Sequence, residues 1–189
     1  MRKIKIIEHI SLDGVIEHDG DYEYGAWTTP YRSPAGLQLY MEVQGNEFDL
    51  LIGRHTYDVW SGFWPNAGSS PIADRMNGAT KYVATHYPDT LTWGPVKDLG
   101  LDIIEGIRNL KSTEGPDLIV SGSSTLTSIL LDSDLADEVV FVVYPVLLGK
   151  GKRLFSEGYA ARELEFISSN VTPTGVLLNT YRHVGALKK

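Results

Sequence analysis

The chain has 189 residues, no cysteine and a formal net charge of −7 at neutral pH. The excess of acidic residues argues against general nucleic-acid binding, which requires a basic contact surface, and against an anionic membrane surface. The lack of cysteine excludes a disulfide framework and thiolate chemistry. No apolar run is long enough to cross a bilayer, so we expect a cytoplasmic protein with a single domain over residues 1–189.

Segments with the periodicity of strands and of helices alternate along the chain. Strands are predicted where short apolar or alternating runs end at turn residues, at 3–10, 48–52, 81–85, 118–120 and 139–146. Helices are predicted at 34–44, at 54–60, and around the apolar stripes at 103–110 and 126–130. The stripe of the first helix consists of Leu37, Tyr40, Met41 and Gln44. Residues 60–70 are rich in aromatic residues, Gly, Pro and Ser, and are expected to form a loop.

The order of these elements predicts the fold class. Strands that alternate with helices pair in parallel through right-handed crossovers. Residues 139–146 form the longest apolar β-branched run and are expected to be a central strand. Residues 164–171 and 176–183 flank Pro173-Thr174-Gly175 and predict a closing antiparallel hairpin. We therefore expect a three-layer α/β domain with a mostly parallel mixed sheet and an antiparallel C-terminal hairpin.

The most informative segment is the junction at Gly53, where a strand ends and a helix begins with Arg54, His55 and Thr56. The free N–H groups at the start of a helix attract anions. A cation there opposes the helix dipole unless an anion lies between them, so Arg54 is well placed for a phosphate. An exposed Arg54 with Thr56 as a helix cap explains the same residues, because strand–glycine–helix turns are common in α/β folds.

A second junction of this kind runs from Gly122 through Ser123, Ser124 and Thr125 to Leu126. The glycine lets the backbone approach a ligand closely, and the hydroxyl and N–H groups can hold a pyrophosphate. The alternative is an ordinary cap supplied by Ser123 or Ser124. Neither the GxGxxG fingerprint nor a P-loop is present.

A third strand is expected to end at Thr85 and His86. In open α/β sheets, ligands bind beyond the carboxyl ends of the strands. Three strand ends with polar residues therefore predict a ligand site along this edge of the sheet.

The order of four motifs resembles the dihydrofolate reductase-like superfamily. Residues 52–57 (IGRHTY) are similar to the cofactor motif of dihydrofolate reductases. Residues 11–14 (SLDG) resemble the opening motif of the reductase domain of bifunctional riboflavin-biosynthesis proteins. Residues 137–139 (DEV), followed by 145–155 (PVLLGKGKRLF), resemble the closing signature of that domain. The match extends over essentially the whole chain.

This resemblance implies NADPH as the cofactor, in preference to NADH. It places the adenosine 2′-phosphate among Arg54, Thr85 and His86. It places the other phosphates at the helix that begins with residues 54–56 and in the turn formed by residues 122–126. The implied activity is reduction of a small pterin-like or pyrimidine-like heterocycle.

One departure from the family pattern concerns the proton donor. Dihydrofolate reductases keep a buried carboxylate early in the helix that precedes the cofactor motif. Counting back from Gly53, that position falls near Leu37 and Gln38, which cannot donate a proton as a carboxylic acid does. Glu42 lies more than one helical turn further along. We therefore expect that the chain is not a true dihydrofolate reductase.

Asp13 is the best remaining carboxylate near the expected cleft, and it is the candidate catalytic residue. The matching motif lines the active site of the riboflavin-type reductases. An aspartate before a glycine also forms turns, and the sequence leaves both roles open.

Other polar and aromatic residues allow two interpretations each. The aromatic residues can provide flat walls for a heterocycle or can be core or dimer contacts: Trp27, Trp60, Phe63 and Trp64. A basic cluster can bind a substrate phosphate or lie in a solvated loop: Lys150, Lys152 and Arg153. His9 and His183 form no HxxxH or HxH pair, so no metal site is expected.

Three hypotheses follow for the function. The first is an NADPH-dependent reductase acting on a small-molecule substrate, and we expect it to be a homodimer as the riboflavin-type relatives are. The second is an NADP-binding protein that keeps the cofactor cleft with little or no turnover. The third is a purely structural dimeric domain, which the three polar strand ends disfavour.

Overall fold

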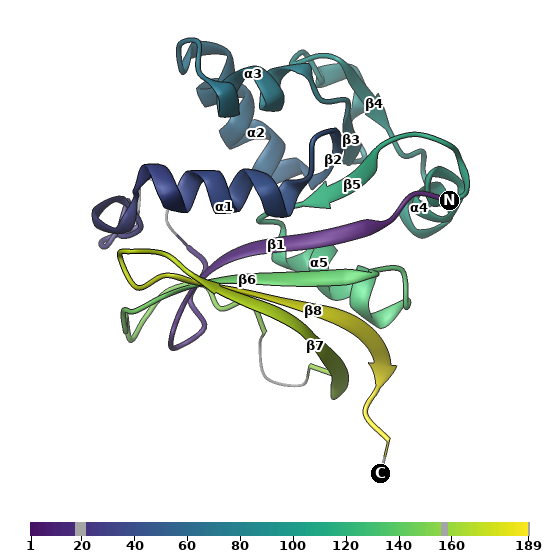
Figure 1. Ribbon diagram of the computed structural model, residues 1–189. Helices are drawn as coiled ribbons and strands as arrows, with labels where there is room; N and C mark the ends of the chain where they lie inside the picture. Colours follow the sequence, from purple (N-terminus) through teal and green to yellow (C-terminus); the bar gives the residue numbers. More distant parts are fainter. Residues whose placement is uncertain (18–21, 156–158, 189) are drawn as a thin grey trace.

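The computed structural model describes residues 1–17, 22–155 and 159–188. The strands of these residues form one eight-stranded sheet in the order β4-β3-β2-β5-β1-β6-β8-β7 (Figure 1). Their bounds are β1 Ile4–Ser11, β2 Phe48–Gly53, β3 Lys81–Ala84, β4 Val96–Asp98, β5 Asp117–Val120, β6 Glu138–Tyr144, β7 Arg162–Val171 and β8 Leu177–Ala186. Neighbouring strands from β4 to β6 are parallel, whereas β8 pairs antiparallel with both β6 and β7. The mostly parallel sheet with its antiparallel C-terminal hairpin confirms the predicted fold class.

Helices cover both faces of the sheet. They are α1 Pro34–Gln44, α2 Arg54–Phe63, α3 Pro71–Gly78, α4 Ile103–Ser112 and α5 Ser124–Asp132. Side chains from α2 and α3, among them Tyr57 and Met76, pack on one face, which α1 also covers. Side chains from α4 and α5, among them Ile107 and Leu130, pack on the other. The strands β1, β2 and β5 lie between these two layers, which explains why they are apolar on both faces.

Three of the helices begin with a side-chain cap. The hydroxyl of Ser33 accepts a hydrogen bond from the backbone N–H of Gly36 at the start of α1. Ser70 and Asp102 cap α3 and α4 in the same way. Each cap satisfies one of the N–H groups that have no partner inside the helix. The remaining two helices lack this feature.

The structure corrects the expectation for residues 60–70. The helix α2 continues to Phe63, a 3₁₀ turn follows at Trp64–Asn66, and α3 begins at Pro71. The short strand β4 was not expected from the sequence either. The last turn of α2 was not predicted because its Gly and aromatic residues have low helix propensity. Packing of Trp60 and Trp64 on the core outweighs this low propensity.

The expected apolar stripe of α1 is also partly wrong. Leu37 is 42% exposed, whereas Leu39, Tyr40 and Val43 pack against the core. The face that contacts the sheet is therefore rotated toward residues 39, 40 and 43. The run at 139–146 does form an interior strand, β6, although it joins the parallel part of the sheet to the antiparallel hairpin and is not at the centre.

The two neighbours of β1 differ in length, and this difference positions the site. The pairing of β1 with β5 ends where Ile6 faces Val120. The pairing of β1 with β6 continues until Ser11 faces Tyr144. The second half of β1 therefore lies beside the turn that follows β5, and no strand pairs with it on that side.

Candidate functional site

A pocket of about 330 Å³ lies at the carboxyl ends of β2, β3 and β5. Its walls come from the three turns that follow these strands, together with α4, α5 and the loop after β6. The lining residues are Gly53, Arg54, His55, Thr56, Ala84, Thr85, His86, Ile103, Ser123, Ser124, Thr125, Leu126, Ile129 and Lys152. The structure thus brings together all the residues proposed from sequence for the cofactor except Gly122, which belongs to the turn but not to the pocket wall. Sequence reasoning did not assign Ala84, Ile103, Ile129 or Lys152 to the cofactor.

The side chain of Ser123 joins two of the turns. Its hydroxyl accepts a hydrogen bond from the backbone N–H of Gly53 at 2.9 Å and lies 2.8 Å from the hydroxyl of Thr56. Gly122 has a φ of +64°, and a Cβ atom there would lie 3.0 Å from the hydroxyl oxygen of Thr56. A side chain at position 122 would therefore fill the space where the two turns approach each other.

The two helices that begin at the pocket have no side-chain caps. The N-cap of α2 is Gly53, and the N-cap of α5 is Ser123 in the left-handed conformation with a φ of +58°. The side chains of Thr56, Ser123 and Ser124 therefore do not cap these helices, which was the alternative interpretation of the sequence. Backbone N–H groups at such helix starts are satisfied by an anion or by water. Two uncapped helix starts, hydroxyl groups and a glycine cradle fit the phosphates of a dinucleotide.

Arg54 lines the pocket, and its guanidinium group is held by three neighbours. Nε donates to the carboxylate of Asp58 at 2.8 and 2.9 Å. Nη1 donates to the hydroxyl of Thr90 at 2.6 Å and to the carbonyl of Tyr87 at 3.2 Å. Within the described residues, Nη2 makes no hydrogen bond. The side chain is 34% exposed, so Nη2 can donate a hydrogen bond to an anionic ligand.

Glu8 lies beneath the turn after β5, and sequence reasoning did not single it out. Its side chain is buried, and its carboxylate accepts hydrogen bonds from the N–H of Gly122 at 3.1 Å and the hydroxyl of Thr127 at 3.4 Å. Burial raises the pKa of this carboxyl well above its ordinary value. The signal in the sequence was a carboxylate inside a predicted strand of a mostly parallel sheet, in which strands are usually buried on both faces.

Asp13 does not line the pocket, and its carboxylate is occupied by the loop after β6. Oδ1 accepts hydrogen bonds from the hydroxyl of Ser11 at 2.6 Å and the N–H of Leu148 at 3.1 Å. Oδ2 accepts one from the N–H of Gly149 at 2.7 Å, and Arg153 lies 3.7 Å away. These hydrogen bonds, led by that of Ser11, lower the pKa of Asp13 to about 2. The carboxyl is therefore ionised at neutral pH and has no proton to donate.

An aromatic cluster lies on the face of the sheet that α1 covers, at the ends of β1 and β6. Nδ1 of His9 lies 2.8 Å from the hydroxyl of Tyr144, and the ring of His9 lies 5.2 Å from that of Tyr40. Trp27 and Tyr31 contact the ring of Tyr144 edge-on. Burial raises the pKa values of Tyr40 and Tyr144 to about 12. Because side chains alternate along a strand, His9 and Glu8 face opposite sides of β1.

Most of the other aromatic and basic residues singled out from the sequence contact other side chains of the protein. Trp64 contacts both Trp60 and Phe63 edge-on, and Trp60 and Trp64 pack against the core. Lys150 pairs with Glu23, and Arg153 pairs with Asp13. Of the basic cluster, Lys152 is the residue that lines the pocket.

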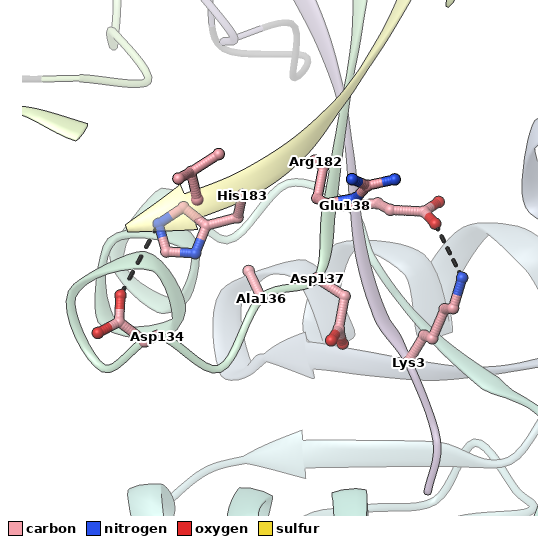
Figure 2. Close-up of a pocket in the computed structure, with 8 residues that line it drawn as sticks. Lys3, Asp134, Ala136, Asp137, Glu138, Arg182 and His183 are labelled. Atoms are coloured by element: carbon pink, nitrogen blue, oxygen red, sulfur yellow. Dashed lines mark hydrogen bonds and ion pairs between the residues drawn. The ribbon is translucent and has the colours of Figure 1, made fainter. Parts of the chain in front are cut away.

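A second pocket, of about 350 Å³, lies at the opposite end of the sheet, where β1 and β6 begin (Figure 2). Its charged side chains are paired: Lys3 lies 3.1 Å from Glu138, and Asp134 faces both Arg162 at 3.3 Å and His183 at 4.0 Å. Asp137 pairs with Lys111 and Arg182 with Glu165.

The described residues lack two features. No helix there is long and apolar enough to cross a membrane. No group of three or more potential His, Asp or Glu metal ligands occurs in the same part of the chain.

Solved structures with this arrangement define a class. The chain matches a riboflavin biosynthesis protein from Shewanella sp. PV-4 with a TM-score of 0.65 and 23% identity, over 96% of this chain and 98% of that chain. It matches dihydrofolate reductase from Enterococcus faecalis, complexed with NADP(H) and RAB-propyl, with a TM-score of 0.61 and 17% identity over 96% of each chain. The fold is therefore dihydrofolate reductase-like.

The family is more specific than the fold. The family model for the RibD C-terminal domain matches residues 2–178, so the chain belongs to this family. Two uncharacterised proteins of Bacillus subtilis (strain 168) are similar to it. YyaP is 24% identical over 145 residues, covering 74% of this chain and 77% of YyaP, and YwjB is 27% identical over 157 residues, covering 82% and 84%. The resemblance inferred from the motifs is confirmed.

Proposed function

We propose that the protein is an NADPH-dependent reductase of a small pterin-like or pyrimidine-like heterocycle, and that residues 1–189 act as one domain. The observation that carries this proposal is the pocket formed by three strand-end turns, into which two uncapped helices open. Membership of the RibD C-terminal domain family and the NADP(H) complex of the similar dihydrofolate reductase support the choice of cofactor.

Each part of the pocket suits one part of NADPH. Arg54, Thr85 and His86 surround the adenosine 2′-phosphate, with Nη2 of Arg54 as the charged donor. The N–H groups of residues 54–56 and 123–126, with the hydroxyls of Ser124 and Thr125, hold the remaining phosphates, and Gly122 lets the turn approach them closely. NADPH supplies a hydride when it is bound. The protein orients the cofactor and substrate and excludes water from the reacting atoms.

The proton is not delivered by the carboxylic acid found in dihydrofolate reductases. Leu37 and Gln38 are exposed, and Gln38 donates a hydrogen bond to an exposed Glu42 at 3.0 Å. Without a positioned acid, reduction of a pterin ring loses roughly two to four decades of rate. We therefore propose that dihydrofolate is not the natural substrate. Asp13 stays in the proposal as the candidate catalytic residue, in a role that an ionised carboxylate can fill, such as orienting a substrate N–H group.

Steady-state oxidation of NADPH, followed by absorbance, tests this proposal. The substrate panel contains pterins, folates and aminopyrimidine ribityl phosphates, and each reaction is repeated with NADH. We expect turnover with one class of heterocycle and turnover of dihydrofolate far below ordinary enzymatic rates. Efficient reduction of dihydrofolate near neutral pH would refute the substrate assignment.

A second candidate is an NADP-binding protein of the same fold with little or no turnover. It is favoured by the absence of a carboxylate among the described residues that line the pocket. Tight binding of NADPH with no oxidation by any member of the panel would select it. Absence of NADPH binding would instead favour the third, purely structural role.

We also propose that the protein is a homodimer. The last two strands expose large apolar side chains: Phe166 is 61% exposed, Val171 64% and Val184 49%. Exposed apolar area of this kind at a sheet edge is typical of a surface covered by a partner. Light scattering coupled to size-exclusion chromatography is expected to give twice the mass of the chain, and a monomer at micromolar concentration would contradict the proposal.

A further inference from the structure

The buried carboxyl of Glu8 and the proposed pyrophosphate site lie on opposite sides of the same backbone turn, the one that follows β5. Glu8 accepts hydrogen bonds from the N–H of Gly122 and the hydroxyl of Thr127, and only 2% of the residue is exposed. Ser123, Ser124 and Thr125, which lie between these two partners, line the pocket. Glu8 therefore holds the inner side of the turn whose outer side faces the cofactor site.

The start of α5 is consequently approached by two acidic groups. The partial positive charge of an uncapped helix start favours one anion. A second unit charge several ångströms away, in a poorly solvated site, is strongly disfavoured. The pyrophosphate of NADPH stays ionised in the physiological range of pH, so Glu8 is the group whose protonation state can change.

The other groups around Glu8 provide little compensation. Lys152, which also lines the pocket, is the cation whose charge reaches Glu8, and its effect is smaller than that of burial. Tyr40 of α1 is the other titratable group that interacts with Glu8. Residues 121–131, which form the turn after β5 and most of α5, contain no ionisable side chain. On β6, Glu8 faces Phe141, and the ionisable residues Glu138 and Tyr144 lie three positions away on either side.

We propose that Glu8 is a positioning residue of the cofactor site that takes up a proton from solvent when the pyrophosphate of NADPH binds beside it. This inference rests on the proposed function. In the neutral form, the carbonyl oxygen of Glu8 still accepts the hydrogen bond from Gly122, and its O–H can donate to the hydroxyl of Thr127. The turn keeps its shape while the second negative charge is removed.

The proposal gives a definite pH dependence. Below the pKa of Glu8 in the free protein, the carboxyl is already protonated and the affinity for NADPH is constant with respect to this group. Above that pKa, binding requires uptake of one proton, so the affinity falls by up to about tenfold per pH unit. Glu8→Gln keeps a hydrogen-bond acceptor for Gly122 but cannot titrate, so it is expected to abolish this dependence.

The decisive experiment is calorimetric titration of the full chain and of Glu8→Gln with NADPH between pH 6 and 9.5, in two buffers with different ionisation enthalpies. The dissociation constant of the unmutated chain, divided by that of Glu8→Gln, cancels the titrations that both proteins share, including that of the 2′-phosphate. We expect this ratio to grow with pH and the unmutated chain to take up more protons on binding than Glu8→Gln does. A ratio that is constant with pH, or NADPH binding by the unmutated chain without proton uptake at every pH, overturns the inference.

Two further readouts keep the test independent of folding and of the proposed function. Burial raises the pKa of Glu8 in the folded state, so the folded chain binds more protons than the unfolded chain above a pH of about 4.3 and loses stability as pH rises from there. Glu8→Gln is therefore expected to gain thermal stability relative to the unmutated chain at alkaline pH. If the variant does not fold, proton uptake by the unmutated chain above about pH 8, where the 2′-phosphate is fully ionised, decides. Failure of the unmutated chain to bind NADPH at any pH would refute the proposed function itself, whereas binding without proton uptake refutes only the role of Glu8.

Discussion

The pockets at the two ends of the sheet have nearly the same volume, about 330 and 350 Å³, but they differ in the polar groups that line them. The pocket at the amino ends of β1 and β6 (Figure 2) is rich in charged side chains. Its Lys, Arg, Asp and Glu side chains each have an ion-pair partner. The pocket at the carboxyl ends of β2, β3 and β5 has fewer charges, but two helices open into it without caps. The proposed assignment of the cofactor therefore depends on the two uncapped helix starts and not on the number of charges.

The helix starts show the same contrast. Ser33, Ser70 and Asp102 cap the helices that begin away from the carboxyl-end pocket. At the pocket, the hydroxyl of Ser123 is used instead to hold the N–H of Gly53. The side chain of Ser123 therefore fixes the distance between two turns, and the helix starts at the pocket have no side-chain cap.

The largest effect is expected from placing a charge at the uncapped start of α5. Thr125 is exposed and lines the pocket. Thr125→Asp adds an anion that satisfies the helix start and repels the pyrophosphate, so the affinity for NADPH is expected to fall about a hundredfold. Thermal stability is expected to stay equal or rise, because acidic residues stabilise a first helical turn. Thr125→Asn is the neutral control. Equal NADPH affinity of the Asp and Asn variants would show that α5 does not hold the phosphates.

The next effect concerns the preference for NADPH over NADH. Removing the guanidinium in Arg54→Ala is expected to reduce this preference by one to two decades, the equivalent of a charge-assisted contact of roughly 1.5–3 kcal/mol. Arg182→Ala is a matched control, since Arg182 also pairs with a carboxylate and lines the other pocket. Fluorescence titration with both nucleotides measures the preference. An unchanged preference in Arg54→Ala would remove Arg54 from the 2′-phosphate site.

A substitution of Asp13 distinguishes a structural role in its turn from a role in catalysis. Its pKa is lowered to about 2, so its hydrogen bonds stabilise the fold above the unfolded pKa of about 3.9 and this contribution is lost as pH falls toward 2. Asp13→Asn is expected to lower the free energy of unfolding by about 1–2 kcal/mol at pH 7 and by much less at acid pH, with NADPH affinity unchanged. Urea denaturation at several pH values measures this difference. If turnover also falls tenfold or more, Asp13 acts on the substrate; full turnover would assign it to the turn alone.

The smallest effects are expected at the amino-end pocket. Lys3 is 60% exposed in its side chain and pairs with Glu138. Lys3→Ala is expected to change the free energy of unfolding by less than about 1 kcal/mol, because exposed ion pairs contribute little. NADPH affinity should not change. A loss of affinity comparable to that of Arg54→Ala would mean that the two pockets have been assigned the wrong way round.

Most of the fold and of the pocket could be predicted because they depend on local patterns. The strands end at glycine or hydroxyl residues, and parallel strands bring their carboxyl ends to one edge, so Gly53, Thr85 and Ser123 were expected to meet. Helix α3 and strand β4 were missed because they are short and weakly periodic.

Two features of the candidate site depend on contacts between distant segments, and the sequence could not resolve them. The hydrogen bonds from Leu148 and Gly149 to Asp13 join residues 135 and 136 positions apart. Burial of Glu8 depends on Gly122 and Thr127 closing over it. Such contacts decide whether a carboxyl group is ionised, and they follow from topology and not from local periodicity.

Hydrogen–deuterium exchange with and without NADPH tests the central claim most directly, because it reports on both ends of the sheet in one experiment. NADPH is expected to slow exchange of the backbone amides in residues 53–57 and 122–127, at the two uncapped helix starts. No change is expected in residues 134–138 and 182–184, which surround the amino-end pocket. Protection confined to the amino-end pocket, or saturating NADPH without protection at either helix start, would contradict the account.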